Sequence, residues 1–539
     1  MSSSNTLSGK SIIAGVAASS KGETFQGYAP TDGSALEPLF FSATMSDVEE
    51  AVQAAAAAAP ALAAVSGRER GKLLRHIADA LDSAAETLIE RAMLETTLTR
   101  PRLTGEVGRT SKQLRHFAQL VEDGWWVNAR IDTGDVALTP PRPDLRSMLR
   151  PLGPGVVFGA SNFPPAFSVA GGDTASALAA GNPVVFKAHP AHPGTGELVG
   201  KIIAESVAAC SLPPGTFSLL FDSGHAVGVT LVQHPLVQAV GFTGSFRGGR
   251  ALMDLAANRP VPIPVYAEMG STNPVFILPG ALSENSEKIA VGLHGSFTLG
   301  GGQFCTKPGM AFVERNASQG LREKLRSLTS EGAAFSLLTS GISEQYNAKL
   351  AERQALLTSS GATEGGGFSA RPSLLETDFD TFAKDHTLAE EVFGRTLLVV
   401  HCESHEQLLE AAKNLEGHLT ATILGTEEDL VQHSELLRFL ETKVGRLIFN
   451  GYPTGVEVCH SMAHGGPYPA TSDGRSTSVG SARLSFASHV QSPTRECRNR
   501  RFHQHYKTTT QKTFAASGTG NGDKAGPSEN KKTRSLWVL

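Results

Sequence analysis

The sequence predicts an α/β protein built around parallel β-sheets. From residue 150 onward, short β-rich runs such as "GPGVVFG" and "GNPVVFKAHP" alternate with helix-length segments such as "FSVAGGDTASALAA". Strands that alternate with helices of this length indicate βαβ units, whose strands are parallel. A chain of 539 residues is also too long for one hydrophobic core, so we expect two or three domains.

The first elements expected along the chain are helices. Residues 46–65, "SDVEEAVQAAAAAAPALAAV", open with a Ser at the N-cap and acidic residues in the first turn, and then continue in alanine, the best helix former. These capping signals favour an ordinary helix over a low-complexity tract. A second helical stretch is expected over residues 67–97.

The strands that follow form two series. In the first series, "GTFSLLF" and "VQAVGFTGS" continue the alternation, with a helical stretch between them. A second α/β series begins near residue 265 and reaches about residue 460. Parallel sheets bind ligands at the carboxyl ends of their strands, so functional side chains are expected there.

Composition and charge limit the classes of function. The net charge of −4 is small for this length and predicts no bulk attraction to nucleic acid or to an anionic membrane. No apolar run reaches the roughly 18–20 residues that span a bilayer. The N-terminus lacks the basic and apolar regions of a secretory signal. These features predict a cytoplasmic globular protein.

The cysteines are scattered and odd in number: Cys210, Cys305, Cys402, Cys459 and Cys497. They form no CxxC pair and no metal-ligand spacing, so we expect reduced thiols and no metal site.

One cysteine has an unusual setting. The stretch "SFTLGGGQFCTKPG" places three glycines ahead of Cys305 and a lysine, Lys307, behind it. Alone, this cysteine is consistent with a small buried hydrophobe. The glycines, however, allow backbone amides to approach a reacting oxygen, and Lys307 would lower the pKa of the thiol. The context favours a nucleophile.

A thiolate that attacks a carbonyl needs an oxyanion donor and a base. "GASNFP" supplies Asn162 at the end of a predicted strand, and "YAEMGSTNP" supplies Glu268 ahead of a glycine loop. Taken alone, Asn162 is equally consistent with an Asx turn and Glu268 with a solvated charge.

A phosphate-binding turn is a further candidate. In "VQAVGFTGSFRGGRAL", a strand is followed by Gly244, Ser245 and Gly249 and then by a helix, whose terminal amides suit a phosphate. The glycines do not match GxGxxG, so a plain βα turn remains an alternative. "VVFKAHP" ends a strand with Lys187, which is suited to ribose hydroxyls or a phosphate; the alternative is a surface lysine.

Together these segments resemble the aldehyde dehydrogenase superfamily. The NFP stretch, the strand-ending lysine, FTGS, the glutamate segment, GQ-x-C and a later "EEVFGR" occur in the order found in that superfamily, over roughly residues 20–480. The resemblance implies a Rossmann-type cofactor domain, an α/β catalytic domain and a small oligomerisation element.

The resemblance also implies roles for these residues. Cys305 would attack the aldehyde to give a thiohemiacetal, Asn162 and the Cys305 amide would stabilise its oxyanion, and hydride transfer would leave a thioester that Glu268 hydrolyses through water. Glu391 would hold the nicotinamide ribose, and Phe393 would lie against the nicotinamide. Relatives usually have proline where this chain has Arg395.

The cofactor implied is NADP, with NAD as a second possibility. NAD-preferring relatives carry an acid three residues after the strand-ending lysine, where this chain has Pro190. Without that carboxylate nothing repels a 2′-phosphate. Lys187 would favour the phosphate, and His225 or Arg247 would assist if they are not simply surface residues.

The implied substrate comes from two longer stretches, "SNFPPAFSVAGGDTASALAAGNPVVFKAHPAHPGT" and "FNGYPTGVEVCHSMAHGGPYPATSDGRSTSVG". They resemble the bacterial 2,5-dioxopentanoate (alpha-ketoglutaric semialdehyde) dehydrogenases, which form 2-oxoglutarate. Arg475 is a candidate for the substrate carboxylate or a structural loop residue, and His460 and His464 are expected in core or loop roles. The alternatives are a broad-specificity fatty or aliphatic aldehyde dehydrogenase and a catalytically silent protein with the same fold.

The expected domains are a cofactor domain over residues 1–265, a catalytic domain over 266–462, a C-terminal loop and return segment over 463–489, and an atypical tail over 490–539. An oligomerisation hairpin is expected near residues 130–155, within a dimer or tetramer.

The C-terminal segment casts doubt on that assembly. Beyond Gly480 the chain has eleven Lys and Arg against three Asp and Glu, and no sustained periodicity. "SARLSFASHVQSPTREC" does not resemble the interface-closing strand with which the relatives end, and a shifted reading frame is one hypothesis. We expect disorder over most of residues 490–539.

Overall fold

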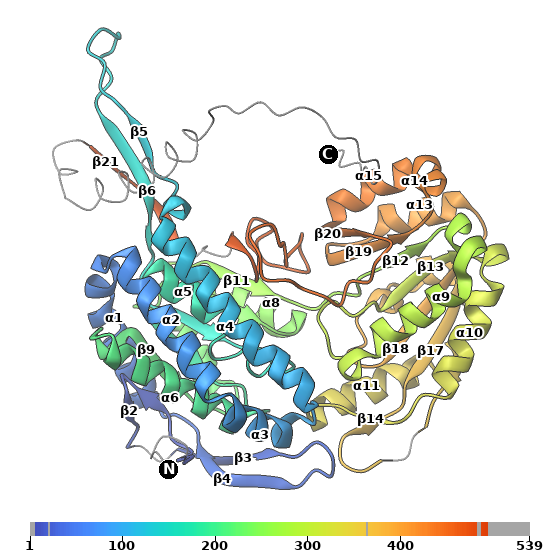
Figure 1. Cartoon of the computed structure of the whole chain (residues 1–539), viewed down its shortest axis with the longest axis horizontal. Helices are drawn as coiled ribbons and strands as arrows, with labels where there is room; N and C mark the ends of the chain where they lie inside the picture. Colours follow the sequence, from blue (N-terminus) through green and yellow to red (C-terminus); the bar gives the residue numbers. More distant parts are fainter. Residues whose placement is uncertain (1–5, 20–21, 363–364, 482–486, 494–539) are drawn as a thin grey trace, which may run out of the picture.

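The computed structural model describes residues 6–19, 22–362, 365–481 and 487–493. It has two α/β halves side by side and a three-stranded arm that projects from the first half (Figure 1). The chain after the last strand of the second half returns between the two halves. Within the described residues, no helix is both long and apolar enough to cross a membrane.

The first half contains a seven-stranded sheet. Its order across the sheet is β11 (Val265–Glu268), β10 (Ala239–Thr243), β7 (Gly155–Phe158), β8 (Val184–Lys187), β9 (Phe217–Leu220), β1 (Ile12–Ile13) and β2 (Val16–Ala17). The strands from β11 to β9 are parallel, as the alternating pattern predicts. The short strands β1 and β2 continue the sheet in antiparallel pairing.

Helices cover both faces of this sheet. One face packs against α2 (Gly67–Ser83), α4 (Arg100–Asp123), α5 (Gly172–Ala180) and α6 (Pro193–Ala209), and the other against α1 (Met45–Ala64), α7 (Ala226–Gln233) and α8 (Phe246–Ala257). Neighbouring residues such as Val156 and Val157 point into different clusters, because side chains alternate along a strand. The second helical stretch predicted from the sequence is divided into two helices: α2 ends at Ser83, and α3 (Ala85–Thr96) follows.

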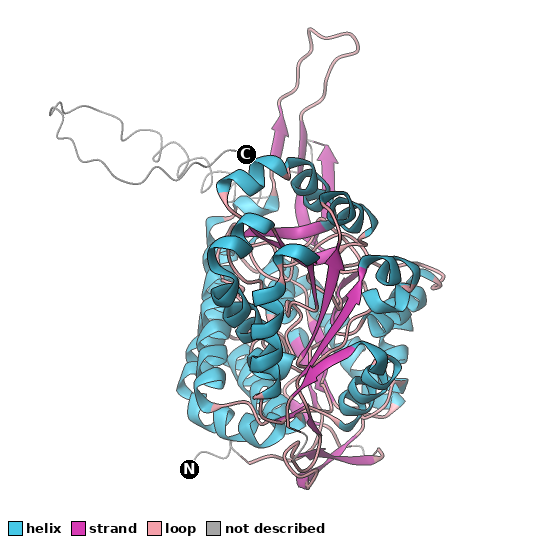
Figure 2. Cartoon of the chain, turned by 90° about the vertical axis from the view of Figure 1, so that its right-hand side faces the viewer, coloured by secondary structure: helices cyan, strands magenta, loops and turns pink. Residues whose placement is uncertain are grey.

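The second half repeats this architecture. Its sheet has the order β15 (Leu357–Ser360), β17 (Ser373–Asp378), β18 (Thr396–Cys402), β13 (Met310–Glu314), β12 (Val275–Ile277), β19 (His418–Leu424) and β20 (Val444–Phe449). Only β15 is antiparallel to its neighbour within this sheet. Helices again flank the strands, as Figure 2 shows from the side. They are α9 (Pro279–Thr298), α10 (Gln319–Ser330), α11 (Ser340–Glu352), α12 (Phe379–Lys384), α13 (His405–Asn414), α14 (Glu427–Gln432) and α15 (Ser434–Lys443).

The projecting arm is an antiparallel sheet of β5 (Arg130–Asp132), β6 (Leu145–Pro151) and β21 (Ala487–Pro493). Its hairpin lies within the range expected for an oligomerisation element, and that role stays a prediction. Two further pairs complete the described strands: β3 (Thr24–Tyr28) with β4 (Ala35–Phe41), and β14 (Phe335–Ser336) with β16 (Ser369–Ala370).

The strand β21 corrects one expectation about the C-terminus. Residues 490–493 were expected to begin a disordered tail, but β21 pairs with β6 in continuous register from Ala487 to Pro493. A strand edge offers backbone N–H and C=O groups to any extended segment, so an unfamiliar sequence suffices for the pairing. The rest of the predicted tail, residues 494–539, lies outside the described residues.

Candidate active site

Most of the predicted site residues lie where the parallel strands of the first sheet end. Glu268 is the last residue of β11 and pairs with Thr243 at the end of β10. Lys187 is the last residue of β8 and pairs with Phe158 at the end of β7. Because these strands are parallel, their carboxyl ends meet at one edge of the sheet.

The loop before Cys305 has a backbone that only glycine adopts readily. Gly300, Gly301 and Gly302 follow one another with φ of 56°, 73° and 68°. A Cβ on Gly302 would also overlap the backbone carbonyl of Gly394. The three glycines are therefore required for three consecutive left-handed backbone conformations and for the close approach of two backbone segments. They are not there to make the loop flexible.

A side chain from the glutamate loop holds the other flank of Cys305. The Nδ2 group of Asn273 donates to the carbonyl of Cys305 at 2.8 Å and to that of Lys307 at 2.9 Å. Asn273 is fully buried and follows Glu268 by five residues. The loop of the candidate nucleophile and the loop of the candidate base are thus joined through one amide.

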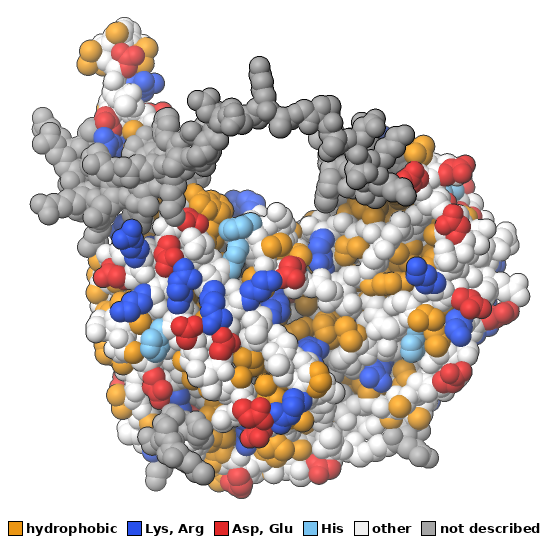
Figure 3. All heavy atoms as spheres, in the orientation of Figure 1, with side chains coloured by type: hydrophobic (Ala, Val, Ile, Leu, Met, Phe, Trp, Pro, Cys, Tyr) orange, Lys and Arg blue, Asp and Glu red, His pale blue; other side chains and the backbone are white. Residues whose placement is uncertain are grey.

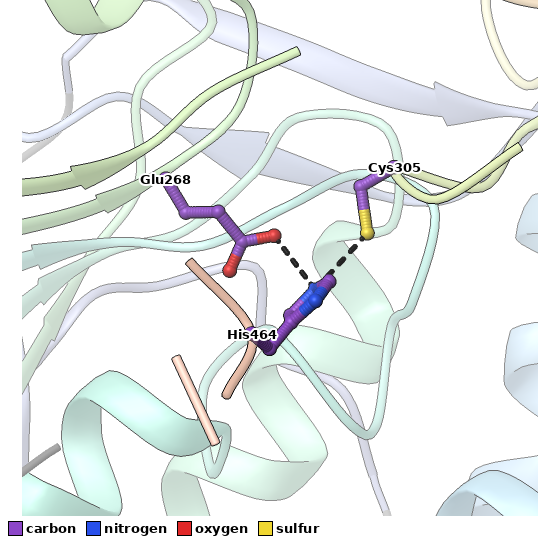
Figure 4. Close-up of side chains that lie close together, drawn as sticks. All are labelled: Glu268, Cys305 and His464. Atoms are coloured by element: carbon purple, nitrogen blue, oxygen red, sulfur yellow. Dashed lines mark hydrogen bonds and ion pairs between the residues drawn. The ribbon is translucent and has the colours of Figure 1, made fainter. Parts of the chain in front are cut away.

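Cys305, His464 and Glu268 form the chemical centre of the site. Nε2 of His464 lies 3.3 Å from Sγ of Cys305 and 2.9 Å from Oε1 of Glu268. Figure 4 shows the imidazole between the sulfur and the carboxylate. The three ligand-type atoms lie within 4.8 Å of one another, which is also close enough to hold one metal ion, although no metal-ligand spacing was expected from the sequence.

His464 lies in the segment that returns between the two halves. Its backbone N–H donates to Oγ1 of Thr477 at 2.6 Å, and its carbonyl accepts from the N–H of Ser478 at 2.7 Å. Its ring packs beside Phe167 with centroids 6.0 Å apart. His464 is buried in a loop, as expected, but its contact with the thiol, 159 residues away in the chain, was not predicted from the sequence.

The environment determines which atom carries a proton. Nε2 of His464 faces a carboxylate and a sulfur, so a proton on Nε2 satisfies both contacts as a donor. Burial raises the pKa of the Cys305 thiol well above its ordinary value, and the charge of Glu268 raises it further. Burial also opposes the Glu268 carboxylate, but the charge and hydrogen bond of His464, together with hydrogen bonds from Ser478 and Cys305, hold the pKa of Glu268 below its ordinary value.

Lys307 does not act on the thiol as expected. Its Nζ donates to the carbonyls of Val392 and Thr396, both at 2.9 Å. Burial lowers the pKa of Lys307 to about 8, while the nearby charge of Glu391 opposes that shift. The charge that lowers the thiol pKa comes instead from Arg109 of α4.

Asn162 lies against the Cys305 loop. Its Nδ2 donates to the carbonyl of Gln303 at 2.8 Å, and an amide nitrogen carries a second hydrogen. The aromatic rings of Phe163 and Phe304 meet edge to face nearby, with centroids 5.0 Å apart. The structure thus brings Asn162 to the segment of the thiol, as the sequence suggested.

The candidate phosphate turn has the predicted local form. Ser245 caps α8, and its Oγ accepts from the N–H of Gly248 at 3.2 Å. Gly244 donates its N–H to the carbonyl of Glu268 at 3.0 Å, which joins this turn to the candidate base. Gly249 is buried, and a Cβ there would lie 2.5 Å from the sulfur of Met269.

Lys187, Glu391 and Phe393 complete the predicted cofactor set. Lys187 donates to the carbonyl of Asp222 at 2.8 Å, and burial lowers its pKa to about 8. Burial raises the pKa of Glu391 to about 7, and its Oε1 is buried without a hydrogen-bond partner. A buried orphan acceptor suits the hydroxyls of a ribose. Phe393 is half-buried two residues further on.

The remaining cofactor candidates lie at the surface. His225 and Arg247 are both exposed, at the starts of α7 and α8, and Pro190 is half-buried after β8. Arg247 follows the Ser245 cap directly, so it borders the candidate phosphate turn.

The structure does not place Arg475 with the thiol. Its side chain is 91% exposed and forms an ion pair with Asp473 in its own turn. The expectation that Arg475 binds the substrate carboxylate is therefore wrong in position, because the local turn bends it toward solvent. His460 is also exposed and bonds to Ser481 at 2.5 Å.

Two arginines near the thiol were missed in the sequence. The charge of Cys305 acts on both Arg109 of α4 and Arg446 of β20, and it opposes the lowering of their pKa by burial. A signal existed for the first: Arg102, Glu106 and Arg109 follow a helical spacing of four and three residues on one face of α4.

Comparison with known proteins gives a family match and two similar relatives. Residues 16–479 match the model of the aldehyde dehydrogenase family. The chain is 45% identical over 493 residues to alpha-ketoglutaric semialdehyde dehydrogenase 2 of Azospirillum brasilense, covering 89% of this chain and 92% of that protein. It is 43% identical over 483 residues to alpha-ketoglutaric semialdehyde dehydrogenase of Acinetobacter baylyi, covering 88% and 91%.

A solved structure supports the fold. 1-Pyrroline-5-carboxylate dehydrogenase from Thermus with bound NAD superposes with a TM-score of 0.79 at 22% identity, covering 90% of this chain and 92% of that one.

Proposed function

Because the chain belongs to the aldehyde dehydrogenase family, we propose that it oxidises 2,5-dioxopentanoate (alpha-ketoglutaric semialdehyde) to 2-oxoglutarate with NADP. The contact of Cys305 with His464, and of His464 with Glu268, carries the proposal of covalent catalysis. The substrate rests on the 45% and 43% identity to two dehydrogenases named for it.

The first step is attack on the aldehyde. The Cys305 thiol loses its proton to solvent, and the N–H of His464 donates to the sulfur as it becomes a thiolate. A thiol whose pKa is raised by burial needs such a donor to react near neutral pH. The sulfur bonds to the aldehyde carbon, and the carbonyl oxygen becomes the oxyanion of a thiohemiacetal.

The second hydrogen of the Asn162 amide stabilises that oxyanion, together with the N–H of Cys305. The nicotinamide cofactor, when bound, supplies the oxidising chemistry by accepting a hydride from the same carbon. Lys187, the turn at Gly244, Ser245 and Gly249, Glu391 and Phe393 would hold it. The fit rests on the buried, unpartnered Oε1 of Glu391 and on the capped turn at Ser245.

The last step releases the acid. Glu268 takes a proton from water, the water oxygen bonds to the thioester carbon, and the carbon–sulfur bond breaks. The products are a carboxylate and the Cys305 thiolate, and the protons on Glu268 and on the new acid pass to solvent. His464 then again holds the thiolate by its N–H.

We propose NADP rather than NAD because the third residue after Lys187 is Pro190. An acidic side chain there would repel a 2′-phosphate, and proline does not. Arg247, exposed at the start of α8, adds a cation beside the phosphate turn. Steady-state rates with saturating NADP and NAD test this choice, and a higher kcat/KM for NAD would contradict it.

A second substrate class has a specific observation in its favour. Phe163, Phe167, Phe304 and Val458 form an apolar cluster with Phe163 and Phe304 flanking the nucleophile loop, which suits a fatty or aliphatic aldehyde. Comparison of kcat/KM for 2,5-dioxopentanoate and octanal separates the two. We expect the higher value for 2,5-dioxopentanoate; a large preference for octanal would replace our substrate with the aliphatic class.

A further inference from the structure

We propose that Arg109 of α4, assisted by Arg446 of β20, binds the carboxylate of the aldehyde substrate and so sets the preference for an anionic aldehyde. This inference rests on the proposed function and deepens it. It moves the anion site from Arg475, which the sequence suggested, to two arginines on opposite sides of the returning segment.

Arg109 packs against the face of Phe167, whose ring also lies beside His464, and one of its nitrogens has no hydrogen-bond partner. The charges of Cys305, Glu106 and Glu268 all act on its guanidinium. Its Nε donates to the carbonyl of Val456 at 3.4 Å and its Nη1 to Oε1 of Gln113 at 3.3 Å, both long hydrogen bonds. Its Nη2 is buried and has no hydrogen-bond partner. A buried guanidinium donor left unpaired is costly unless a ligand accepts its hydrogen.

The acids near Arg109 are engaged with other cations. Glu106 pairs with Arg102 at 2.7 Å, and Glu457 pairs with Lys112 at 2.5 Å. Within the part of the chain that the structure describes, Arg109 forms no ion pair of its own. The face of Phe167 supports its guanidinium, 4.6 Å from the ring centroid, which fixes the plane of the fork.

Arg446 approaches the same segment from the second half of the molecule. Its Nη1 donates to the carbonyl of Gly455 and its Nη2 to that of Pro453, at 2.7 Å and 2.8 Å. Its Nε is buried without a partner, and the charge of Cys305 acts on it. Together the two arginines donate hydrogen bonds to backbone carbonyls within residues 453–456. Each arginine still has one side-chain nitrogen without a hydrogen-bond partner.

A carboxylate is the ligand that this arrangement suits. Nη2 of Arg109 and Nε of Arg446 are the donors left for a carboxylate, and two cations replace the water that a 2-oxo acid loses on entering a buried site. In Figure 3, Lys and Arg side chains lie among Asp and Glu side chains on the surface over α2 and α4, so the choice of a carboxylate as the ligand rests on Arg109 and Arg446.

The experiment compares two aldehydes of equal chain length in the full-length enzyme with NADP. The readout is the ratio of kcat/KM for 2,5-dioxopentanoate to that for pentanal, which lacks the carboxylate. Arg109→Gln should lower this ratio by about 10- to 100-fold, the range for one lost hydrogen bond to a charged group. The loss should appear mainly in KM. Arg475→Gln is the matched control, because it removes an exposed arginine, and it should leave the ratio unchanged.

A second variant guards against misfolding. Arg109→Lys keeps the charge but not the fork, so it should lower the ratio less than Arg109→Gln does. An unchanged ratio in folded Arg109→Gln, or a larger loss in Arg109→Lys than in Arg109→Gln, overturns the role of Arg109, whereas the proposed function stands if the wild-type enzyme still prefers 2,5-dioxopentanoate. If the wild-type enzyme itself prefers pentanal, the proposed function fails, and this inference fails with it.

Discussion

At the scale of single residues, the reacting thiol depends on a histidine that lies 159 residues away in the chain. Burial and the charge of Glu268 both oppose a thiolate at Cys305. A hydrogen-bond donor directed at the sulfur therefore has a large effect on how readily the thiolate forms. The Nε2–H group of His464 contacts both the Cys305 sulfur and the Glu268 carboxylate. His464 therefore positions both side chains.

Replacement of His464 by asparagine should lower kcat by about 10²–10³-fold, within the range of positioned proton-transfer groups. The thiolate loses its donor, so the already raised pKa of Cys305 rises further and its reactivity at each pH falls. Alkylation of Cys305 by iodoacetamide, followed by peptide mass spectrometry across pH, measures this. Alkylation should speed up with pH in both proteins and be slower in the variant.

His460→Asn is the matched control, since that ring is exposed and bonds to Ser481. Equal alkylation rates in His464→Asn and the wild-type enzyme would remove the histidine from the account.

Lys187 gives a pH dependence of cofactor binding. Burial lowers its pKa to about 8 from an ordinary value of 10.5, so the ammonium is present below pH 8 and is lost as the pH rises through that value. The dissociation constant of NADP should therefore increase above about pH 8. Titration calorimetry measures it. Lys187→Arg should flatten this dependence, because arginine stays charged; a flat profile in the wild-type enzyme would exclude Lys187 from phosphate binding.

At the scale of elements, the turn from residue 300 to 302 sets the position of the thiol. Its three positive φ angles follow a 20-residue helix, and Gly302 lies against the carbonyl of Gly394. The turn therefore also joins the Cys305 loop to the segment of Glu391 and Phe393. A change of side chain here should move both the nucleophile and the cofactor contacts.

Gly302→Ala should lower the free energy of unfolding by at least about 1–2 kcal/mol, since alanine is strained in the left-handed region and its Cβ overlaps a backbone carbonyl. Activity should fall as well. Gly295→Ala in α9 is the control, because nothing lies within 4 Å of a Cβ there. It should stabilise the helix by up to about 1 kcal/mol. Thermal unfolding measures both, and equal melting temperatures would contradict the strain argument.

The sequence predicts an element well when the element has a clear hydrophobic periodicity. It predicts poorly a strand that forms only because it pairs with a distant strand. Strand-ending residues such as Lys187 and Glu268 were expected at the carboxyl edge of a parallel sheet, and they lie there. The break between α2 and α3 gave no proline or glycine signal. Strand β21 was missed because it depends on the free edge of β6, more than 330 residues away, and not on its own composition.

At the scale of the whole molecule, the site forms where three separate parts of the chain converge. The first sheet supplies Glu268, the second half supplies Cys305, and the returning segment supplies His464. Resemblance to a family anticipated the first two, since their motifs are local. It could not place His464 or Arg109, because their contacts with the thiol arise only when the halves and the returning segment pack together.

The same reasoning explains the error at Arg475. Its sequence neighbours suggested a substrate loop, but its turn closes on Asp473 and directs the guanidinium outward. Side-chain direction in an irregular segment has no periodic signal, so only the folded arrangement determines it.

The most direct test of covalent catalysis by Cys305 is the mass of the Glu268→Gln variant after it is mixed with 2,5-dioxopentanoate and NADP. With no base to activate water, the thioester should persist. We predict a burst of NADPH close to one per active site, and an acyl adduct on Cys305 that Cys305→Ala never forms. NADPH production by Cys305→Ala, or turnover by Glu268→Gln without any adduct on Cys305, would contradict the account.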